Sequence, residues 1–280
     1  MSLPLLSTRK RPLIRMGIHR EIRQLLAGAA SLVQWLSPPC CLLCEATHDR
    51  QQPICLRCEL ALPRNRLACH QCGLPLAAEA RRTSQQISRS DRCVNCLRSP
   101  PRFQQTLAPF LMQEEMRKLI HLWKFHGQSQ LTPLLAALFA RAAPPDYPKS
   151  TEEPAVLVPV PTQWYRQVRR GFDHTWLLAT ALQWQLCRKP DVKHWLRNSR
   201  YQRPQHQLDR RTRIKGGADR FVAHPGVADR HIILIDDVMT TGSTAHSAAG
   251  ACNEQGARSV AIWCLARTPA PENKVRDALR

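Results

Sequence analysis

The sequence has no long apolar run, few acidic residues for its many basic ones, and no glycine-rich nucleotide loop in its most distinctive segment. A membrane-spanning helix needs about 20 consecutive apolar residues, and no run approaches that length. Residues 231–245, HIILIDDVMTTGSTA, lack both the G-x-x-x-x-G-K of a P-loop and the G-x-G-x-x-G of a dinucleotide fold. A bilayer span and these two kinds of phosphate site are therefore not expected.

The shortage of acidic residues gives the chain a large positive charge. Its 280 residues contain 41 Lys and Arg against 21 Asp and Glu, a net charge of +20. Residues 161–221 hold 14 basic and 4 acidic residues, which is about half of that excess. A surface that only needs to be soluble would normally mix both signs. The charge favours an anionic partner, such as nucleic acid or a phosphorylated ligand.

The N-terminal segment has basic residues before a moderately apolar stretch, as a signal peptide has. Gln34 interrupts that stretch, and no small-residue cleavage site follows. An amphipathic helix is plausible near residues 18–36, and Met16 could equally be the start of translation. We treat residues 1–39 as an extension without assigned function and expect a cytoplasmic protein.

Eight of the 12 cysteines form four C-x-x-C pairs within 56 residues. Two such pairs supply the four thiolates of a tetrahedral zinc site, and a site with four protein ligands is structural. Disulfides would need an oxidising compartment, and four pairs in series argue against a redox C-x-x-C. We expect two Zn²⁺ ions in residues 40–100, held in the simplest pairing by Cys41, Cys44, Cys55 and Cys58, and by Cys69, Cys72, Cys93 and Cys96.

Other zinc ligand sets stay open at this point. The pairs could interleave, Cys40 could replace Cys41, and His48 or His70 could substitute for a cysteine. The isolated cysteines Cys187, Cys252 and Cys264 stand in apolar surroundings and are expected to be buried as small hydrophobic residues.

Residues 105–270 alternate predicted helices and strands. Met116, Leu119, Ile120 and Trp123 have helical spacing, and further helices are predicted over 132–142, 174–187 and 243–255. Strands are predicted over 155–160, 232–235 and 258–266, and an arginine-rich loop over 198–217. This alternation predicts an α/β domain with a mainly parallel sheet, preceded by the small cysteine-rich domain. Ligands of such sheets bind at the carboxyl ends of the strands.

Segment 231–245 places two acids at such an end. Asp236 and Asp237 follow four apolar residues and precede a turn of small hydroxyl-bearing residues. A strand ending in a polar turn is the plain alternative. The turn, however, exposes backbone N–H groups where a helix begins, which suits a phosphate, and the carboxylates suit sugar hydroxyls or a metal. The segment predicts a site for a phosphorylated ribose.

ILIDDVMTTGST resembles the phosphoribosyl-pyrophosphate (PRPP) motif of type I phosphoribosyltransferases. Together with the cysteine pairs, LWKFHG, VPVP…RRGF and PQHQL…R, it is similar to the ComF family of DNA-uptake (competence) proteins, including the GntX-type members. The resemblance covers roughly residues 40–268. It implies a double zinc ribbon joined to a phosphoribosyltransferase-like domain with a role in handling single-stranded DNA.

The resemblance also implies roles for particular residues. Asp236 and Asp237 would act in catalysis by holding the ribose hydroxyls and Mg²⁺. The expected PRPP-binding residues are Met239, Thr240, Thr241, Gly242, Ser243, Thr244, Lys124, Arg170 and Gly171. The family's usual Asn-Gln after R-G-F is Asp173-His174 here, and its Asn in the loop of 198–217 is Gly216. Asp173 places negative charge where pyrophosphate is expected, which counts against pyrophosphate contact by this loop.

Two functions fit these features. In the first, the protein transfers a ribosyl 5-phosphate from PRPP to an acceptor that the sequence does not identify. In the second, it is a non-catalytic single-stranded DNA-binding adaptor, with the zinc ribbons docking partners such as a helicase or other DNA-uptake or recombination proteins. Aromatic residues among the arginines of 161–221 suit base stacking, although Trp176 and Trp184 are expected in the core. Arg210, Arg211 and Arg213 are the candidate contacts to DNA phosphates.

Overall fold

The computed structural model describes residues 39–76, 92–142, 155–162, 171–186, 189–199 and 220–270. The chain divides after Cys55 into two units, so residues 39–55 are described by themselves. The expected N-terminal helix and nearly all of the arginine-rich loop lie outside the described residues. Within them, no helix combines the length and apolar character needed to cross a bilayer.

Residues 39–55 form turns rather than regular elements. The Cys41 N–H donates to the carbonyl of Ala46 at 2.9 Å, and the Leu42 N–H donates to the carbonyl of Pro53 at 3.0 Å. Ile54 is fully buried and Cys41 is nearly so. With so little apolar core, this segment depends on its cysteines for a fixed structure.

The second unit begins with short elements around the later cysteines. These are α2 (Leu56–Ala61), an irregular segment over 62–76, and α3 (Val94–Arg98). Gly73 in the irregular segment has φ +69°, and a Cβ there would lie 2.9 Å from the Thr106 side chain. Only glycine fits this left-handed turn at such a close approach.

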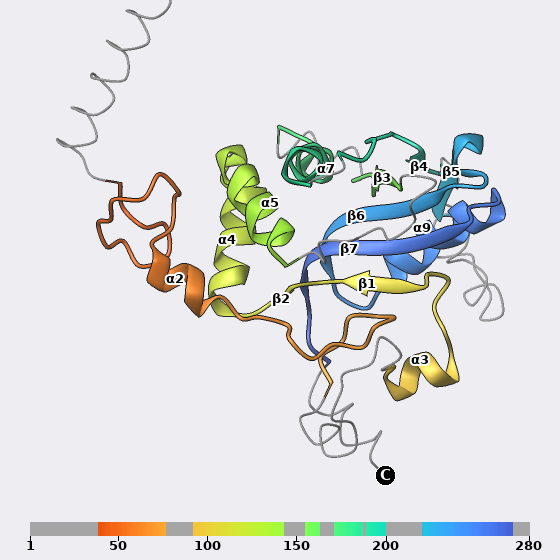
Figure 1. The fold of residues 1–280 in the computed structure, drawn as a ribbon, viewed down its shortest axis with the longest axis horizontal. Coiled ribbons are helices and arrows are strands. Elements are labelled where there is room, and N and C mark those ends of the chain that lie inside the picture. Colours follow the sequence, from red (N-terminus) through yellow and green to blue (C-terminus); the bar gives the residue numbers. More distant parts are fainter. Residues whose placement is uncertain are drawn as a thin grey trace, which may run out of the picture. The chain divides into compact units, whose positions relative to one another are not determined.

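A five-stranded parallel sheet forms the centre of the second unit (Figure 1). Its order is β1-β7-β6-β3, and β2 also pairs with β7. The strands are β1 (Gln105–Leu107), β2 (Phe110–Leu111), β3 (Val156–Pro159), β6 (His231–Met239) and β7 (Ser259–Arg267). The three longest strands, β3, β6 and β7, are largely apolar because helices cover both faces of the sheet. The predicted α/β class and parallel sheet are confirmed.

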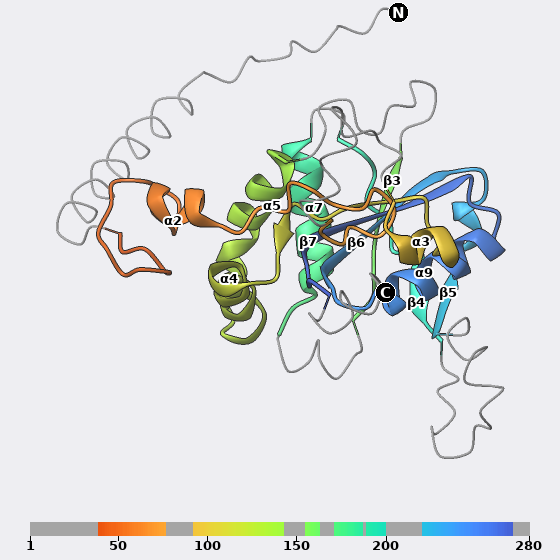
Figure 2. The same cartoon turned by 90° about the horizontal axis from the view of Figure 1, so that it is seen from below.

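Helices cover both faces of the sheet. On one face lie α4 (Glu114–Phe125), α5 (Thr132–Ala140) and α7 (His174–Gln185), with α9 (Ser243–Glu254) on the other (Figures 1 and 2). Phe139 of α5 packs on Trp263 of β7 with ring centroids 5.2 Å apart. The small residues of α9, such as Ala248 and Ala249, let it approach the strands closely. All four predicted helices are present.

The sheet residues alternate between these two covers. Val158, Leu234 and Ile262 face α9 in one core cluster, so that Leu157, Ile233 and Trp263, which alternate with them, face the other layer. Met116, Leu119, Ile120 and Trp123 of α4 are all buried, as their helical spacing predicts. Cys252 and Cys264 are fully buried, also as predicted, and Cys187 lies outside the described residues.

Several features differ from the expectations, and β1 and β2 are strands of the main sheet that had not been predicted. Trp184 was expected in the core, yet it is 71 % exposed, because it lies near the end of α7 beyond the buried Leu178 and Leu182. An antiparallel ladder of β4 (Leu196–Asn198) and β5 (Phe221–Ala223) flanks the arginine-rich loop and had not been predicted. Three-residue strands carry too short a pattern to be recognised.

Candidate functional site

The two acids of segment 231–245 lie in the part of β6 that extends beyond the end of its neighbour β3. Strand β3 pairs with β6 as far as Pro159 opposite Ile235, whereas β6 continues beside β7 to Met239. Asp236 and Asp237 therefore follow the last residue that has a strand on each side. This is the carboxyl edge of a parallel sheet, where ligands of such folds bind.

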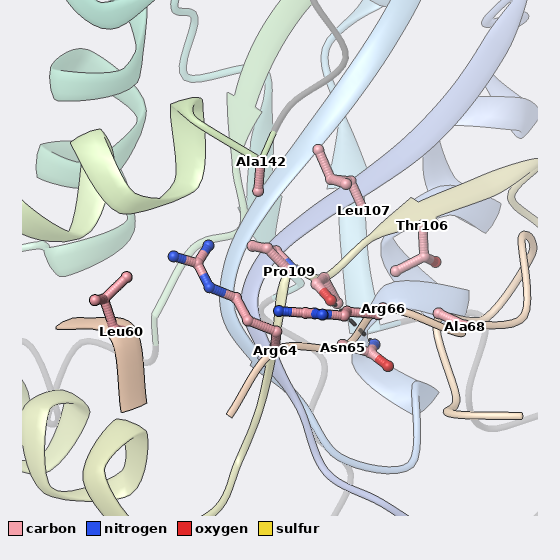
Figure 3. A pocket seen from close by; sticks show the side chains of 10 residues that line it. Leu60, Arg64, Asn65, Arg66, Ala68, Thr106, Leu107, Pro109 and Ala142 are labelled. Atoms are coloured by element: carbon pink, nitrogen blue, oxygen red, sulfur yellow. Dashed lines mark hydrogen bonds between the residues drawn. The ribbon is translucent and has the colours of Figure 1, made fainter. Parts of the chain in front are cut away.

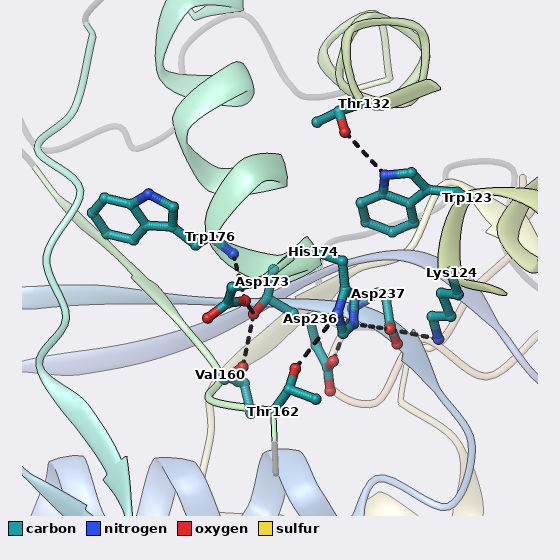
Figure 4. Close-up of polar contacts among 11 residues, drawn as sticks. Trp123, Lys124, Thr132, Val160, Thr162, Asp173, His174, Trp176, Asp236 and Asp237 are labelled. Carbon is teal, nitrogen blue, oxygen red and sulfur yellow. Dashed lines mark hydrogen bonds and ion pairs between the residues drawn. The ribbon is translucent and has the colours of Figure 1, made fainter. Parts of the chain in front are cut away.

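Asp237 contacts two nitrogen donors through one oxygen (Figure 4). Lys124 Nζ of α4 lies 2.5 Å from Asp237 Oδ2, and His174 Nε2 of α7 also contacts this oxygen. Burial alone would raise the pKa of Asp237, but Lys124 and His174 lower it well below its usual range. Asp237 is thus an ionised acceptor, and the Nε2–H of His174 donates to it.

Other contacts fix His174 in this position. Its side chain is 3 % exposed and its ring meets the Trp123 ring edge-on, at a centroid distance of 5.4 Å. Trp123 Nε1 in turn donates to Thr132 Oγ1 at 2.9 Å, and the second ring nitrogen of His174 is 3.5 Å from Thr162 Oγ1. Residues from α4, α5 and α7 therefore converge on the acids of β6.

Asp236 has the opposite electrostatic character. Burial, together with the negative charge of Asp237, raises the pKa of Asp236 to about 7. Its Oδ1 accepts a hydrogen bond from the backbone N–H of Asp237 at 2.8 Å. Adjacent carboxyl groups with pKa values pushed apart are typical of functional sites, because one can hold a proton that the other cannot.

The turn after the acids connects β6 to α9. Gly242 has φ +82° and precedes the first residue of the helix, Ser243. The Ser243 N–H bonds weakly to Thr241 Oγ1 at 3.3 Å, and within the described chain no acceptor is found for the N–H groups of Thr241 and Gly242. Such N–H groups at a helix start favour an anion. The plain alternative, a polar turn alone, leaves the adjacent carboxylates of buried Asp237 and half-buried Asp236 unexplained.

Asp173 serves the helix rather than the anion site. Its carboxylate accepts from the Trp176 N–H at 3.1 Å and from Thr175 Oγ1 at 2.9 Å, which makes it the N-cap of α7. The residues Asp173-His174, noted above as a departure from the family pattern, thus have separate tasks. Gly171 has φ +79° and lies just before them, whereas Arg170 lies outside the described residues.

The cysteines gather in two groups with sequential pairing. In each group the four sulfur atoms lie within 4.8 Å of one another; the groups are Cys41, Cys44, Cys55 and Cys58, and Cys69, Cys72, Cys93 and Cys96. A tetrahedron with Zn–S bonds of about 2.3 Å has edges of about 3.8 Å. The distances from Cys44 to Cys55, 3.8 Å, and from Cys72 to Cys93, 3.6 Å, fit that edge.

The thiols of the second group are too crowded to ionise together unless a metal ion binds them. A hydrogen bond from the Cys72 thiol lowers the pKa of Cys69 to about 4, while burial raises the pKa of Cys96 to about 12. Among the described cysteines there is no disulfide. Two structural zinc sites therefore fit the residues, and His48 and His70 are in neither group.

A separate cavity of about 470 Å³ lies beside α2 and the β1 edge of the sheet (Figure 3). Arg64, Asn65 and Arg66 line it together with Leu60 and Pro109. The guanidinium of Arg64 lies 4.7 Å from the centre of the buried Phe110 ring. Neither acid of β6 lines this cavity, so it is distinct from the carboxyl-edge site.

The structure brings together most of the residues expected at the site, and it adds two. Lys124 joins the acids as expected, and the residues from Met239 to Thr244 form the adjoining turn. His174 had not been selected, because it is 63 positions away from Asp237 in sequence and no spacing rule connects them. Arg267, the last residue of β7, had not been selected either, because it belongs to no motif. The candidate DNA contacts Arg210, Arg211 and Arg213 lie outside the described residues.

Comparisons with known proteins agree with both parts of the chain. Residues 32–97 match the double zinc ribbon domain, and residues 191–279 match the phosphoribosyl transferase domain. The chain is 32 % identical over 183 residues to the DNA utilization protein YhgH of Escherichia coli O6:H1, covering 63 % of this chain and 78 % of that protein.

Two further relatives carry competence names. Competence protein F of Haemophilus influenzae is 29 % identical over 180 residues, covering 62 % of this chain and 78 % of that protein. Competence protein ComFC of Bacillus subtilis is 27 % identical over 165 residues, covering 59 % of this chain and 65 % of that protein.

Proposed function

Because the chain belongs to the ComF family of competence and DNA-utilisation proteins, we propose that it binds PRPP or a related ribose phosphate and acts in the uptake or use of single-stranded DNA. The observation that carries this proposal is the pair of carboxylates, Asp236 and Asp237, beside an anion-binding turn at the carboxyl edge of β6. A cytoplasmic setting, which keeps thiols reduced, suits the two zinc sites.

Each part of the site has a task in holding such a ligand. The carboxylates accept hydrogen bonds from the ribose hydroxyls, since ionised Asp is only an acceptor. The N–H groups of Thr241 and Gly242, with the hydroxyl of Ser243, hold the 5-phosphate. The ammonium of Lys124 is the described cation closest to the acids and stabilises negative charge on the pyrophosphate.

If the protein is an enzyme, the reaction is a ribosyl transfer. The bond from the anomeric carbon to pyrophosphate breaks as a nucleophile forms a new one, so positive charge develops on the ribose and negative charge on the leaving group. Asp236 lies near the first charge and Lys124 near the second, and both act electrostatically. The acceptor that supplies the nucleophile is to be identified by testing candidate compounds.

Magnesium fits this donor set in part. Carboxylate oxygens are ligands that Mg²⁺ prefers, and it would neutralise charge on the leaving pyrophosphate. Asp237 Oδ2 already contacts Lys124 and His174, so the Asp236 carboxylate is the better placed of the two for a metal ion. Since the pKa of Asp236 is about 7, its use by Mg²⁺ should grow as the pH rises through neutrality.

Titration calorimetry with PRPP, with and without Mg²⁺, tests the binding proposal. Asp236→Asn should weaken binding at least tenfold at about pH 8, because the amide lacks the charge and one acceptor. Asp191→Asn is the matched control, since Asp191 is an exposed acid away from the site. Unchanged affinity in Asp236→Asn would contradict the assigned role of the carboxylate.

Turnover separates the enzyme from a binding protein. Pyrophosphate release from PRPP is followed with single-stranded DNA, nucleosides and free bases as acceptors. Release that depends on one acceptor supports the transferase, and tight binding of PRPP without release supports the non-catalytic alternative. Substitution of Lys124 by Met should slow any release more than it weakens binding of ribose 5-phosphate, which has no pyrophosphate.

The DNA-binding alternative is favoured by the charge of residues 161–221 and by aromatic rings in the same segment, of which Trp184 is exposed and Trp176 is half-buried. Trp184 is 71 % exposed, with the ammonium of Lys189 4.9 Å from its ring centre. Trp176 stacks on His194 at 3.8 Å between centroids, and Lys193 and Arg197 nearby are exposed. Flat rings among cations suit the bases and phosphates of a single strand. A helicase or other recombination partner for the zinc ribbons remains part of this proposal.

A further inference from the structure

Arg267, at the end of β7, is a charged residue in the interior. It is 3 % exposed, and burial lowers its pKa from the usual value. Within the described chain its guanidinium donates to four backbone carbonyls, and the Cys72 side chain is a further hydrogen-bond partner, but no carboxylate is. A buried guanidinium without a carboxylate needs such a set of acceptors to offset its desolvation.

These carbonyls come from two distant parts of the chain. Nη1 donates to Met239 at 2.9 Å, to Thr268 at 3.0 Å and, by a short contact, to Thr240. Nε donates to the carbonyl of Cys72 at 2.9 Å. Arg267 therefore joins the start of the ligand turn to a member of the second cysteine group, 195 residues away from it in sequence.

The contacts to Met239 and Thr240 fix the direction of the N–H groups that follow. In a trans peptide the C=O and the next N–H point in opposite directions. Holding the Thr240 carbonyl against Arg267 therefore directs the Thr241 N–H away from Arg267, and the Met239 carbonyl does the same for the Thr240 N–H. The Met239 carbonyl also accepts from the Thr268 N–H at 3.0 Å, so the guanidinium acts chiefly on the Thr240 carbonyl and thereby sets the direction of the Thr241 amide in the anion-binding turn.

The other end of the connection is fixed to the sheet edge. The N–H of Thr106 in β1 donates to the backbone carbonyl of His70 at 3.0 Å, and its Oγ1 donates to the backbone carbonyl of Gln71 at 2.7 Å. The Cys72 carbonyl that receives Arg267 follows directly on these residues. Its position thus depends on β1 on one side and on the Cys72 sulfur, in its group with Cys93, on the other.

We propose that Arg267 is a positioning residue that makes the order of the ligand turn depend on zinc in the second cysteine group, Cys69, Cys72, Cys93 and Cys96. Zinc fixes Cys72, Cys72 and Arg267 fix the carbonyls of Met239 and Thr240, and the following amides are ordered before the ligand arrives. The proposal rests on the proposed ribose-phosphate site for its ligand, but the coupling itself is a property of the ligand-free protein.

Hydrogen exchange of the full-length protein with both zinc ions bound tests the coupling without any ligand. Arg267→Lys keeps a charge but not the planar fork, so one ammonium cannot reach the same carbonyls. Exchange in a peptide covering 239–244 should rise at least tenfold, while a peptide covering β3 keeps its protection. Arg102→Lys is the matched control, because Arg102 makes a partly exposed ion pair with Glu254 at 2.9 Å and should leave 239–244 unchanged.

Removal of each zinc site supplies the second arm. Cys93→Ser should increase exchange at 239–244 as much as Arg267→Lys does, whereas Cys44→Ser in the first group should not. In the double variant with Arg267→Lys, Cys93→Ser should add little further effect, because both remove the same connection. Additive effects of the two substitutions on hydrogen exchange would overturn the proposal. Exchange protection at 239–244 that does not change when the second zinc is removed would overturn it as well.

Ligand binding gives an independent readout. Ribose 5-phosphate should bind at least tenfold more weakly to Arg267→Lys. By linkage it should also tighten zinc binding by the second group of the wild-type protein, so that a chromogenic chelator removes less zinc at equilibrium. If the wild type binds no ribose phosphate, the proposed function fails while the exchange data still decide the coupling. If Arg267→Lys does not fold, exchange at 239–244 in Cys93→Ser and Cys44→Ser decides it.

Discussion

Asp236 and Asp237 are adjacent, yet their substitution by Asn should change stability in opposite directions. Asp237→Asn removes the charge that faces Lys124 and His174, whose side chains are 14 % and 3 % exposed. Breaking a buried charged cluster in this way should cost about 3 kcal/mol. For a domain of this size that loss lowers the Tm by about 6–12 °C. The stabilising contribution of Asp237, whose pKa is lowered, is present above about pH 4 and is lost at lower pH.

Asp236→Asn should instead stabilise the protein at neutral pH. Folding raises the pKa of Asp236 from 3.8 to about 7, so the folded state retains a proton that the unfolded chain releases. Wild-type stability therefore falls as the pH rises from about 4 to about 7 and is level above that range. Between about pH 5.5 and pH 7 the loss amounts to about 2 kcal/mol, which the Asn variant avoids.

Thermal unfolding followed by circular dichroism at about pH 5.5 and about pH 7.5, with zinc in the buffer, measures both effects. The advantage of Asp236→Asn over the wild type should grow between these two values by about 4–8 °C in Tm. Asp237→Asn should have a lower Tm than the wild type at both pH values, and Asp191→Asn should have the same Tm as the wild type at each. A neutral Asp237→Asn, or an Asp236→Asn advantage that does not change with pH, would refute the electrostatic account.

Three other predictions concern zinc, the turn and DNA. Elemental analysis of protein prepared without added metal should find two zinc ions per chain, and one or none would contradict the assignment of two four-cysteine sites. Gly242→Ala places a side chain at φ +82°, which should cost about 1–2 kcal/mol in chemical denaturation and weaken PRPP binding; full stability would show that the turn relaxes freely. Single-stranded DNA binding should have a slope of log affinity against log salt of about −3 to −5, and replacing Arg210, Arg211 and Arg213 with Gln should flatten it by about 2; an unchanged slope would exclude them as contacts.

Local patterns were enough to predict β3, β6 and β7 of the sheet, helices α4, α5, α7 and α9, and the carboxylates. The apolar run of 232–235 and the helical spacing of Met116 and Trp123 reflect burial on known faces, and burial is what such periodicity encodes. The cysteine spacing likewise predicted the two groups that the structure brings together. These features depend on neighbours close in sequence, so a single chain reveals them.

Contacts across the fold could not be predicted in this way. His174 meets Asp237 only because the start of α7 lies over the end of β6, and Arg267 reaches Cys72 across 195 residues. Trp184 was placed in the core because an apolar ring eight positions after Trp176 fits one helix face. The actual buried face of α7 passes through Leu178, Ala179 and Leu182, which leaves Trp184 in solvent.

Short segments cover the two edges of the sheet, beside β1 and β3. An uncovered edge strand offers its free N–H and C=O groups to another molecule and promotes aggregation. At the β3 edge, the Leu157 N–H donates to the backbone carbonyl of Asp191 at 2.8 Å, and the Leu157 carbonyl accepts from the Lys193 N–H at 3.0 Å. These backbone contacts need no metal. At the β1 edge, Thr106 is covered by His70 and Gln71, next to the second cysteine group. Loss of that zinc would uncover one edge of the sheet and not the other, so chelated protein should assemble through β1 into pairs of molecules before it forms larger aggregates.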